Sequence, residues 1–185
     1  LLIGLFMACL SKAIYAQNQT PSAHQPVSFR ASYQLLHSTH RTNFNGVSVD
    51  ANHQFTKRFS AGIGVQYAAT PKHPDNGWQL THLHLLPVYA NGIYTFNTNH
   101  IVQPYLHTEA GISFNHYYKR NAAASLSPFA VSETGLYLSE NVGVRFALWQ
   151  QTHLFVEAGY KGYKHSFNAL DVNPHGFTVR AGIEL

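Results

Sequence analysis

Charged residues are scarce in this sequence: Asp, Glu, Lys and Arg together make up 11% of its 185 residues, against about a quarter in a typical soluble domain. A soluble fold with so few charges would present an unusually bare surface to water. The formal net charge is only +4, and no basic run is longer than Lys57-Arg58 or Lys119-Arg120. The sequence therefore lacks the dense basic patch of a nucleic-acid-binding protein, and we expect no nucleic-acid partner.

Cysteine is nearly absent as well, and the single Cys9 falls in the opening segment "LLIGLFMACLSKAIYAQ". This apolar run ends in the small residue Ala16, is followed by polar residues, and is too short to span a bilayer as a helix. We therefore expect residues 1–16 to be a signal peptide that lacks its first residues, followed by a short periplasmic segment over residues 17–26. The mature chain would then contain no cysteine, which suits passage through an oxidising periplasm without disulfides.

Helical periodicity is missing from the rest of the chain, where apolar and polar residues alternate with a period of two. In "VQPYLHTEAGISF", residues 102–114, Val102 and Ile112 share one face while His107 and Glu109 share the other. The segment 82–96 is apolar on both faces, but its Tyr, Val and Ile content still favours a strand. The pattern predicts eight strands: 27–37, 47–55, 59–69, 82–96, 102–114, 136–149, 153–164 and 177–185.

The predicted connections alternate in length. Short ones lie around residues 56–58, 97–100 and 150–152, and long ones, rich in turn-forming residues, lie at 37–46, 70–79, 119–135 and 166–176. Because neighbouring strands run in opposite directions, all short connections fall at one end of a sheet and all long ones at the other. This asymmetry predicts an all-β fold, an eight-stranded antiparallel up-and-down transmembrane β-barrel over residues 27–185, with long external loops and both termini in the periplasm.

The composition of the polar face decides which face meets water. It carries mainly Gly, Ser, Asn, Gln and Tyr, whereas a water-exposed face would carry many Lys and Glu. Its few charges are balanced, with four of each sign, which suits a narrow interior because an unpaired buried charge costs several kcal/mol. A secreted, lipocalin-like lipid-binding barrel with its apolar face inside is the alternative. The predicted interior charges are Arg30, Arg145, Lys161 and Arg180 against Asp50, Glu109, Glu157 and Glu184.

The stretch "LSENVGVRFALWQQTHLFVEAGY", residues 138–160, joins two alternating strands by a tight turn. With the eight-strand pattern, it resembles the small outer-membrane barrels of Gram-negative bacteria, a family that includes the OmpA transmembrane domain and OmpX. One departure is the terminal Leu185, where many such barrels end in Phe or Trp. The resemblance implies a monomer in the outer membrane, in contact with lipopolysaccharide, inserted by the barrel assembly machinery and without a cofactor.

Two histidines suggest a metal site. His82 and His84 share a strand face, as two chelating ligands would. A third ligand is not evident in the sequence, so we favour an alternative in which both lie near the lipid headgroups with Trp78, Tyr89 and Tyr94.

A catalytic alternative rests on "YKHSFNALDVNPHG", residues 163–176. It is similar to the lipid A deacylases, outer-membrane esterases whose His and Ser lie close together near the end of the penultimate strand. Here His165 would be the base and Ser166 the nucleophile. The two are adjacent, however, and adjacent strand residues point to opposite faces, while the family pattern separates them by one residue. An acid in register after the loop is also missing.

The sequence therefore favours a non-enzymatic outer-membrane barrel over both the deacylase and the soluble barrel. An eight-stranded barrel encloses only enough room for side chains, so a general diffusion pore is not expected. Specific contacts, with an extracellular ligand that the sequence does not identify, are assigned to the long external loops.

Overall fold

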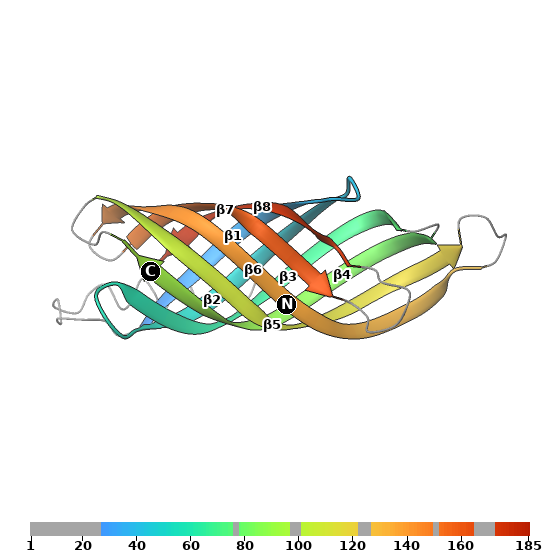
Figure 1. The fold of residues 1–185 in the computed structure, drawn as a ribbon, viewed down its shortest axis with the longest axis horizontal. Helices are drawn as coiled ribbons and strands as arrows, with labels where there is room; N and C mark the ends of the chain where they lie inside the picture. The colour runs from blue at the N-terminus through green and yellow to red at the C-terminus, as the bar shows by residue number, and fades with distance from the viewer. Residues whose placement is uncertain (1–26, 76–77, 97–100, 122–126, 150–151, 165–172) are drawn as a thin grey trace.

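The structure, a computed structural model, describes residues 27–75, 78–96, 101–121, 127–149, 152–164 and 173–185. Eight strands form a closed barrel in which each strand pairs antiparallel with the next and the last pairs with the first (Figure 1). This confirms the predicted fold class. The described residues contain no helix long and apolar enough to cross a membrane. The strands are β1 (Val27–Ser38), β2 (Asn43–Gln54), β3 (Phe59–Asp75), β4 (Trp78–Thr95), β5 (Val102–Asn121), β6 (Phe129–Trp149), β7 (Thr152–Lys164) and β8 (His175–Glu184).

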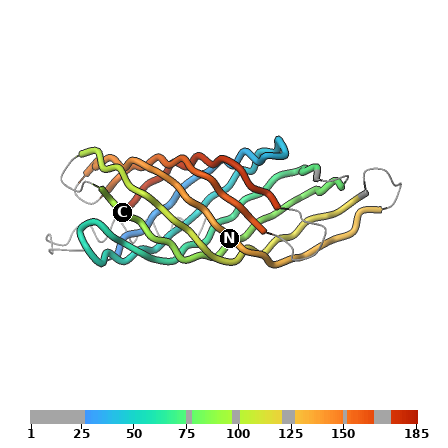
Figure 2. Tube along the Cα trace, in the orientation of Figure 1, coloured from blue at the N-terminus to red at the C-terminus, as the bar shows by residue number. Residues whose placement is uncertain are grey.

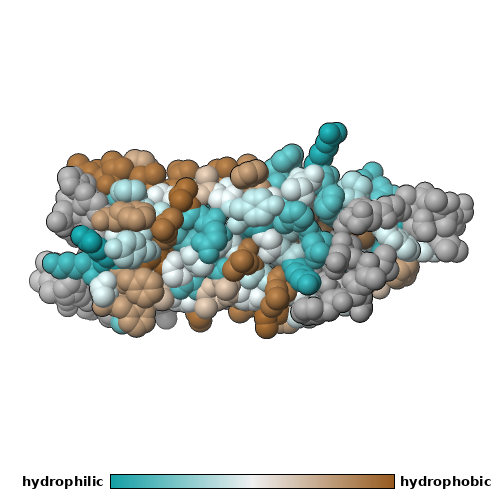
Figure 3. Space-filling model, in the orientation of Figure 1, coloured by the Kyte–Doolittle hydropathy of each residue, from teal (hydrophilic) through white to brown (hydrophobic). Residues whose placement is uncertain are grey.

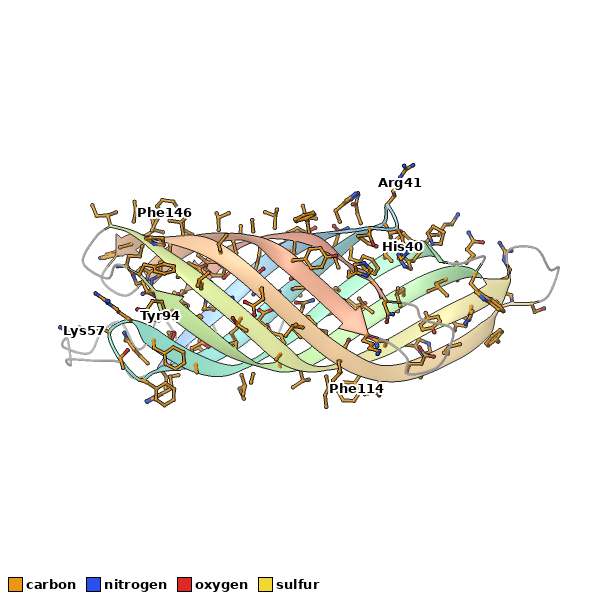
Figure 4. All side chains as sticks on the ribbon, viewed as in Figure 1. His40, Arg41, Lys57, Tyr94, Phe114 and Phe146 are labelled. Atoms are coloured by element: carbon orange, nitrogen blue, oxygen red, sulfur yellow. The ribbon has the colours of Figure 1, made fainter. Side chains whose placement is uncertain are left out.

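The two ends of the barrel differ. Leu185 exchanges backbone hydrogen bonds with Phe29, so the start of β1 and the end of β8 lie at one end of the barrel. The β2–β3 turn containing Lys57 lies at the same end, on the left of Figure 4. We call this the terminal end, and the opposite one the far end.

Strand lengths are uneven. Strands β3 to β6 have 17, 18, 20 and 21 residues, whereas β1, β2, β7 and β8 have 12, 12, 13 and 10. The two hairpins β3–β4 and β5–β6 therefore project beyond the other strands at the far end, as Figures 1 and 2 show on the right.

Two segments that were predicted to be long loops are largely strand in the projecting hairpins. Most of 70–79 and 119–135 is paired strand, with Lys72 opposite Thr81 and Lys119 opposite Phe129. Only residues 39–42 separate β1 from β2, whereas the β7–β8 connection keeps its predicted length. The physical reason is that a strand outside a bilayer does not need an apolar face. Its backbone ladder continues while the period-two hydrophobic signal fades.

The apolar face points outward. Along β5, Val102, Leu106 and Ile112 are exposed, while Tyr105 and Glu109 between them are buried. Figure 4 shows Phe114, Phe146 and Tyr94 directed away from the barrel, and the apolar side chains on the face in Figure 3 gather in its left and middle parts. A barrel that turns its apolar face outward is built for lipid, and the soluble lipid-binding alternative is wrong.

Exposed aromatic side chains mark both limits of the apolar band. Trp and Tyr concentrate at such positions because their rings suit the boundary between hydrocarbon and headgroups. Those near the terminal end are Phe59, Tyr94, Phe96, Phe146 and Trp149, and those toward the far end are Tyr67, Tyr118, Tyr160 and Phe177.

Strand β4 has apolar residues on both faces, and the structure shows where each face lies. Leu86 and Val88 face outward, while Leu85 and Tyr89 point into the barrel. The register shifts between Thr81 and His84, and His82 on this bulge adopts a positive φ of 53°. One face of the strand therefore meets lipid and the other packs inside, and the predicted position of Tyr89 at the headgroups was wrong.

Candidate functional site

The barrel interior is crossed by hydrogen bonds between strands on opposite walls. Arg30 on β1 donates from Nη2 to Glu157 Oε1 on β7 at 2.5 Å, and to the Tyr105 hydroxyl on β5 at 2.9 Å. The Tyr105 hydroxyl donates to the same Glu157 oxygen at 2.8 Å, and His107 Nδ1 lies 3.1 Å from it. These four residues, the Glu157 cluster, tie together three strands that are not neighbours in the sheet.

A second group, the Glu109 cluster, lies beside the first and consists of Glu109, Tyr137, Lys161 and Arg180. Arg180 Nη1 donates to Glu109 Oε1 at 2.7 Å, and the Tyr137 hydroxyl donates to Oε2 at 2.5 Å. Lys161 Nζ lies 3.9 Å from Glu109 Oε2. Arg180 Nη1 also lies 3.6 Å from Glu157 Oε2, so the two clusters form one network.

Lys161 also has neutral partners. It donates to Gln34 Oε1 at 2.5 Å and to Gln66 Oε1 at 2.7 Å. Gln66 in turn donates to the Tyr163 hydroxyl at 2.6 Å. Two neutral amide oxygens therefore complete the contacts of this buried ammonium, as a charge enclosed in protein requires.

The remaining interior charges lie around this network. Asp50 accepts a hydrogen bond from the Tyr89 hydroxyl at 2.7 Å. Arg145 Nη1 is 3.2 Å from Glu184 Oε1, and its Nε donates to Gln103 at 2.7 Å. The Arg145 side chain is 15% exposed, so this pair borders the terminal end.

Inward-facing glycines make room for the large interior side chains. A Cβ at Gly64 would collide with the Asp50 carboxylate and the Tyr89 ring, and one at Gly143 would overlap the Tyr105 ring. Glycine is the residue that permits so close an approach. These positions let rings and guanidinium groups fill a narrow barrel.

Beyond the network, toward the far end, the interior becomes apolar. A plug of Leu36, Phe44, Leu80, Leu83 and Leu85 fills the barrel there, each side chain at most 1% exposed. The plug was not predicted from the sequence: the segment 82–96 was recognised as apolar on both faces, but the inward face of the other strands was expected to be polar. Once a barrel is closed and filled, interior residues need only to pack or to pair, so apolar residues serve as well as polar ones.

Histidines border this plug on its far side. His73 is fully buried, with its ring 5.4 Å from that of His40 and 5.6 Å from that of Phe44. The His40 ring also lies 6.1 Å from that of His175. Burial foremost, and then the neighbouring His40, lower the pKa of His73 to about 4, so it is neutral at ordinary pH.

The structure places all eight predicted interior charges inside the barrel, where seven of them belong to one contact network. His107 was predicted to share a face with Glu109, but neither it nor the tyrosines that complete this network were named among the predicted interior site residues. Both types lie on the same parity as the charges, so the alternation could have found them. The seven connected residues are Arg30, Glu109, Arg145, Glu157, Lys161, Arg180 and Glu184.

The two histidines considered for a metal site have separate neighbours. The His84 Nδ1 atom is 2.6 Å from the Tyr67 hydroxyl on β3, whereas the His82 ring packs against Tyr118 on β5. Tyr94, expected beside them, lies near the terminal end (Figure 4). Over the described ranges, no three His, Cys, Asp or Glu side chains are arranged to hold a metal ion.

The residues of the catalytic alternative, His165 and Ser166, lie outside the described residues, as do the predicted signal peptide and the segment 17–26. Strand β7 ends at Lys164 and β8 begins at His175. The pair therefore belongs to the far-end connection between these strands.

Comparison with known proteins identifies what this architecture is similar to. The family described as outer membrane protein beta-barrel domain matches residues 6–184. No curated protein matches the sequence.

Among solved structures, the Neisserial surface protein NspA is 19% identical, covers 86% of this chain and 94% of its own, and has a TM-score of 0.58. The N-terminal barrel of OprF from Pseudomonas aeruginosa is 16% identical, over 86% of this chain and 96% of its own, with a TM-score of 0.50. Ail of Yersinia pestis, solved with the heparin analogue sucrose octasulfate, is 12% identical, with the same coverage and a TM-score of 0.50. At these identities the likeness concerns the fold.

Proposed function

Because the chain belongs to the outer membrane protein beta-barrel domain family, we propose that it is a non-enzymatic surface protein whose projecting hairpins contact extracellular polyanions. The barrel anchors these hairpins in the outer membrane and leaves the terminal end in the periplasm. The observation that carries the proposal is the length of β3 to β6, which exceeds that of the other strands by several residues.

The filled interior supports an anchoring role over transport. Arg30 and Glu157 meet across the lumen, and so do Arg180 and Glu109. The apolar plug fills the barrel beyond these ion pairs, toward the far end. Eight strands enclose little more than the volume of their side chains. A solute would have to displace both layers, so the useful surface of the molecule is its outside.

The far end supplies the contact surface. Its exposed cations come from four separate connections: Arg41 on the β1–β2 turn, Lys72 and Arg120 on the two projecting hairpins, and Lys164 at the end of β7. Arg120 Nη2 donates to Gln79 at 2.5 Å, which fixes one guanidinium on the hairpin surface. Basic side chains on exposed hairpins attract anionic groups such as sulfates and phosphates.

The Ail complex with sucrose octasulfate suggests which anions to test first. That protein has a similar fold and was solved with a sulfated saccharide. For this chain we therefore propose sulfated polysaccharides as the class of extracellular ligand, with lipopolysaccharide phosphates as neighbours of the same basic side chains.

The test compares two pairs of cations at opposite ends of the barrel. Cells that display the protein are measured for binding to labelled heparin at two salt concentrations. Replacing Lys72 and Arg120 by glutamine is expected to lower binding several-fold at low salt. The same replacement at Lys57 and Arg58, in the β2–β3 turn at the terminal end, leaves binding unchanged. Equal losses from both pairs, or no binding by the original protein, contradict the proposal.

The enzymatic alternative has its own measurement. A deacylase that uses Ser166 as nucleophile would release an acyl chain from lipid A, and Ser166→Ala would abolish the release. We expect lipid A from cells with and without the protein to have identical mass spectra. Loss of an acyl chain that depends on Ser166 would replace the non-enzymatic proposal.

A further inference from the structure

Three histidines gather on the outward surface of β4 and β5. His84 on β4 and His116 on β5 lie directly opposite each other in the sheet. The Tyr118 ring on β5 contacts the His116 ring, with 5.8 Å between centroids, and the His82 ring, with 6.0 Å. His82 and His116 are exposed and His84 is half-buried. The three imidazoles therefore form one group around Tyr118, which we call the histidine patch.

The histidine patch marks the level at which the outward face changes from apolar to polar. On β5 the exposed apolar residues end at Phe114, and His116, Tyr118 and Arg120 follow on the same face toward the far end. Tyr118 belongs to the aromatic belt at that end of the apolar band. Side chains at the level of such a belt meet lipid headgroups, whereas those below it meet hydrocarbon tails.

Hydroxyl groups hold two of these imidazoles in a fixed orientation. The Tyr67 hydroxyl on β3 is 2.6 Å from His84 Nδ1, with the two rings stacked, and the Ser132 hydroxyl on β6 is 3.0 Å from His116 Nδ1. When a hydroxyl donates to Nδ1, the proton of a neutral imidazole lies on Nε2. Neither Nε2 atom has a hydrogen-bond partner among the described residues, so both N–H groups are available to a ligand.

A β-bulge places His82 beside this pair. The register between β4 and β5 shifts between Thr81 and His84, and the positive φ of His82 is a strained conformation for a residue with a side chain. Bulges and strained residues persist where the surrounding structure imposes them, and both are common at binding sites. The strained residue here is itself one of the three histidines, which favours a binding role for the patch.

The charges around the histidine patch are positive. Lys72 on β3 is exposed where that strand pairs with the bulged part of β4, and Arg120 is exposed on β5 beyond the patch. The carboxylates of the neighbouring β6 are directed elsewhere, since Glu133 accepts a hydrogen bond from the buried Tyr117 and Glu140 lies seven residues farther along the strand. Free N–H donors flanked by cations suit a phosphate group.

We propose that the histidine patch binds a phosphate group of lipid A, the lipid anchor of lipopolysaccharide, with the Nε2–H groups of His84 and His116 as donors. The inference rests on the proposed function in one respect, because lipopolysaccharide occupies the outer leaflet and the far end must therefore face outward. A phosphate at headgroup level offers several acceptor oxygens to the two N–H groups, and His82, Lys72 and Arg120 flank it. Its donors are imidazoles, which distinguishes this site from the cations proposed to bind polysaccharide.

Titration of the folded protein in micelles of a non-ionic detergent tests the site. The probes are lipid A with both phosphates, the same lipid without phosphate, and inorganic phosphate. In nitrogen NMR of the imidazoles, the Nε2 signals of His84 and His116 are expected to shift with phosphorylated lipid A only. Shifts of equal size with either other probe, or shifts that require added zinc, overturn the proposal. Micelles have no sidedness, so the result does not depend on the orientation of the barrel or on heparin binding.

Substitutions measure what the imidazoles contribute. Replacing His84 and His116 together by phenylalanine keeps a ring at each position and removes both donors. The affinity for phosphorylated lipid A is expected to fall by about ten-fold or more, the effect of losing one hydrogen bond to a charged group. His53→Phe is the control, because His53 is an exposed histidine at the terminal end that contacts Phe55. A heat-shift gel establishes that each variant is folded. A folded double variant with undiminished affinity, or an equal loss in His53→Phe, overturns the proposal.

Discussion

The interior network predicts a large penalty for removing one carboxylate. In Glu109→Gln the shape of the side chain is kept and its charge is lost. Arg180, which is fully buried, then loses its ion pair at 2.7 Å and retains Glu157 at 3.6 Å. The lumen is left with four cationic side chains against three acidic ones. We expect a loss of stability of about 3–5 kcal/mol, the range for breaking one side of a buried ion pair.

A double substitution separates the value of the pair from the penalty for an uncompensated charge. Replacing Glu109 and Arg180 together by leucine and methionine removes both charges. Paired charges replaced by apolar residues of similar size often leave stability nearly unchanged. The double variant is therefore expected to be more stable than Glu109→Gln alone, although the Tyr137 hydroxyl loses the nearer of its two acceptors and keeps only Gln66 Oε1 at 3.2 Å.

The assay is equilibrium unfolding in urea with the barrel in lipid vesicles, followed by tryptophan fluorescence. Glu133→Gln is the matched control, because this half-buried carboxylate on the projecting part of β6 accepts from the Tyr117 hydroxyl at 2.9 Å. It is expected to change stability by about 1 kcal/mol. If Glu109→Gln is no more damaging than Glu133→Gln, the interior charges are not coupled as the structure indicates.

Three further predictions address the lipid face, the far end and the orientation. Val49→Arg should destabilise the inserted barrel by about 2–4 kcal/mol in the same assay, while Asn43→Arg at the far end of β2 has little effect; similar costs at both sites would contradict the assigned band. Since the pKa of His73 is lowered to about 4 from an ordinary value near 6.5, the unfolded chain takes up a proton before the folded one, so stability should fall as the pH drops from about 6.5 to about 4. His73→Phe should weaken that dependence in thermal unfolding followed by circular dichroism, and an unchanged dependence would show that His73 does not contribute. Protease added to intact cells should cut within residues 121–128 and spare Lys57-Arg58; cleavage at the latter would place the termini outside.

The sequence predicted the barrel where the bilayer imposes a pattern. Within the apolar band, lipid on one side and a polar interior on the other enforce alternation, so the start of β5 and its inward Glu109 could be read directly. Beyond the band this constraint ends. The paired segments around Lys72 and Lys119 were therefore assigned to loops, although their backbone ladders continue.

The contacts of the site needed three-dimensional information. Parity alone shows that Arg30 and Glu157 face inward, but their separation of 127 positions in the chain gives no sign that they touch. That contact depends on how the barrel closes and on which glycines leave space. The inward orientation of the plug residues Leu80 and Leu83 depends on a β-bulge that the sequence pattern does not predict.

The cross-lumen bonds also bear on how the chain assembles. Arg30 on the first strand forms an ion pair with Glu157 on the seventh, and Arg180 on the last strand forms one with Glu109 on the fifth. A sheet whose first and last strands have not yet met keeps Arg30 away from Glu157, whereas Arg180 already faces Glu157 across the β7–β8 pair. The Arg30–Glu157 ion pair forms only when the seam between β1 and β8 closes, so closure adds a stabilising contact that the open sheet lacks. Intermediates with an open seam are disfavoured by the loss of this contact.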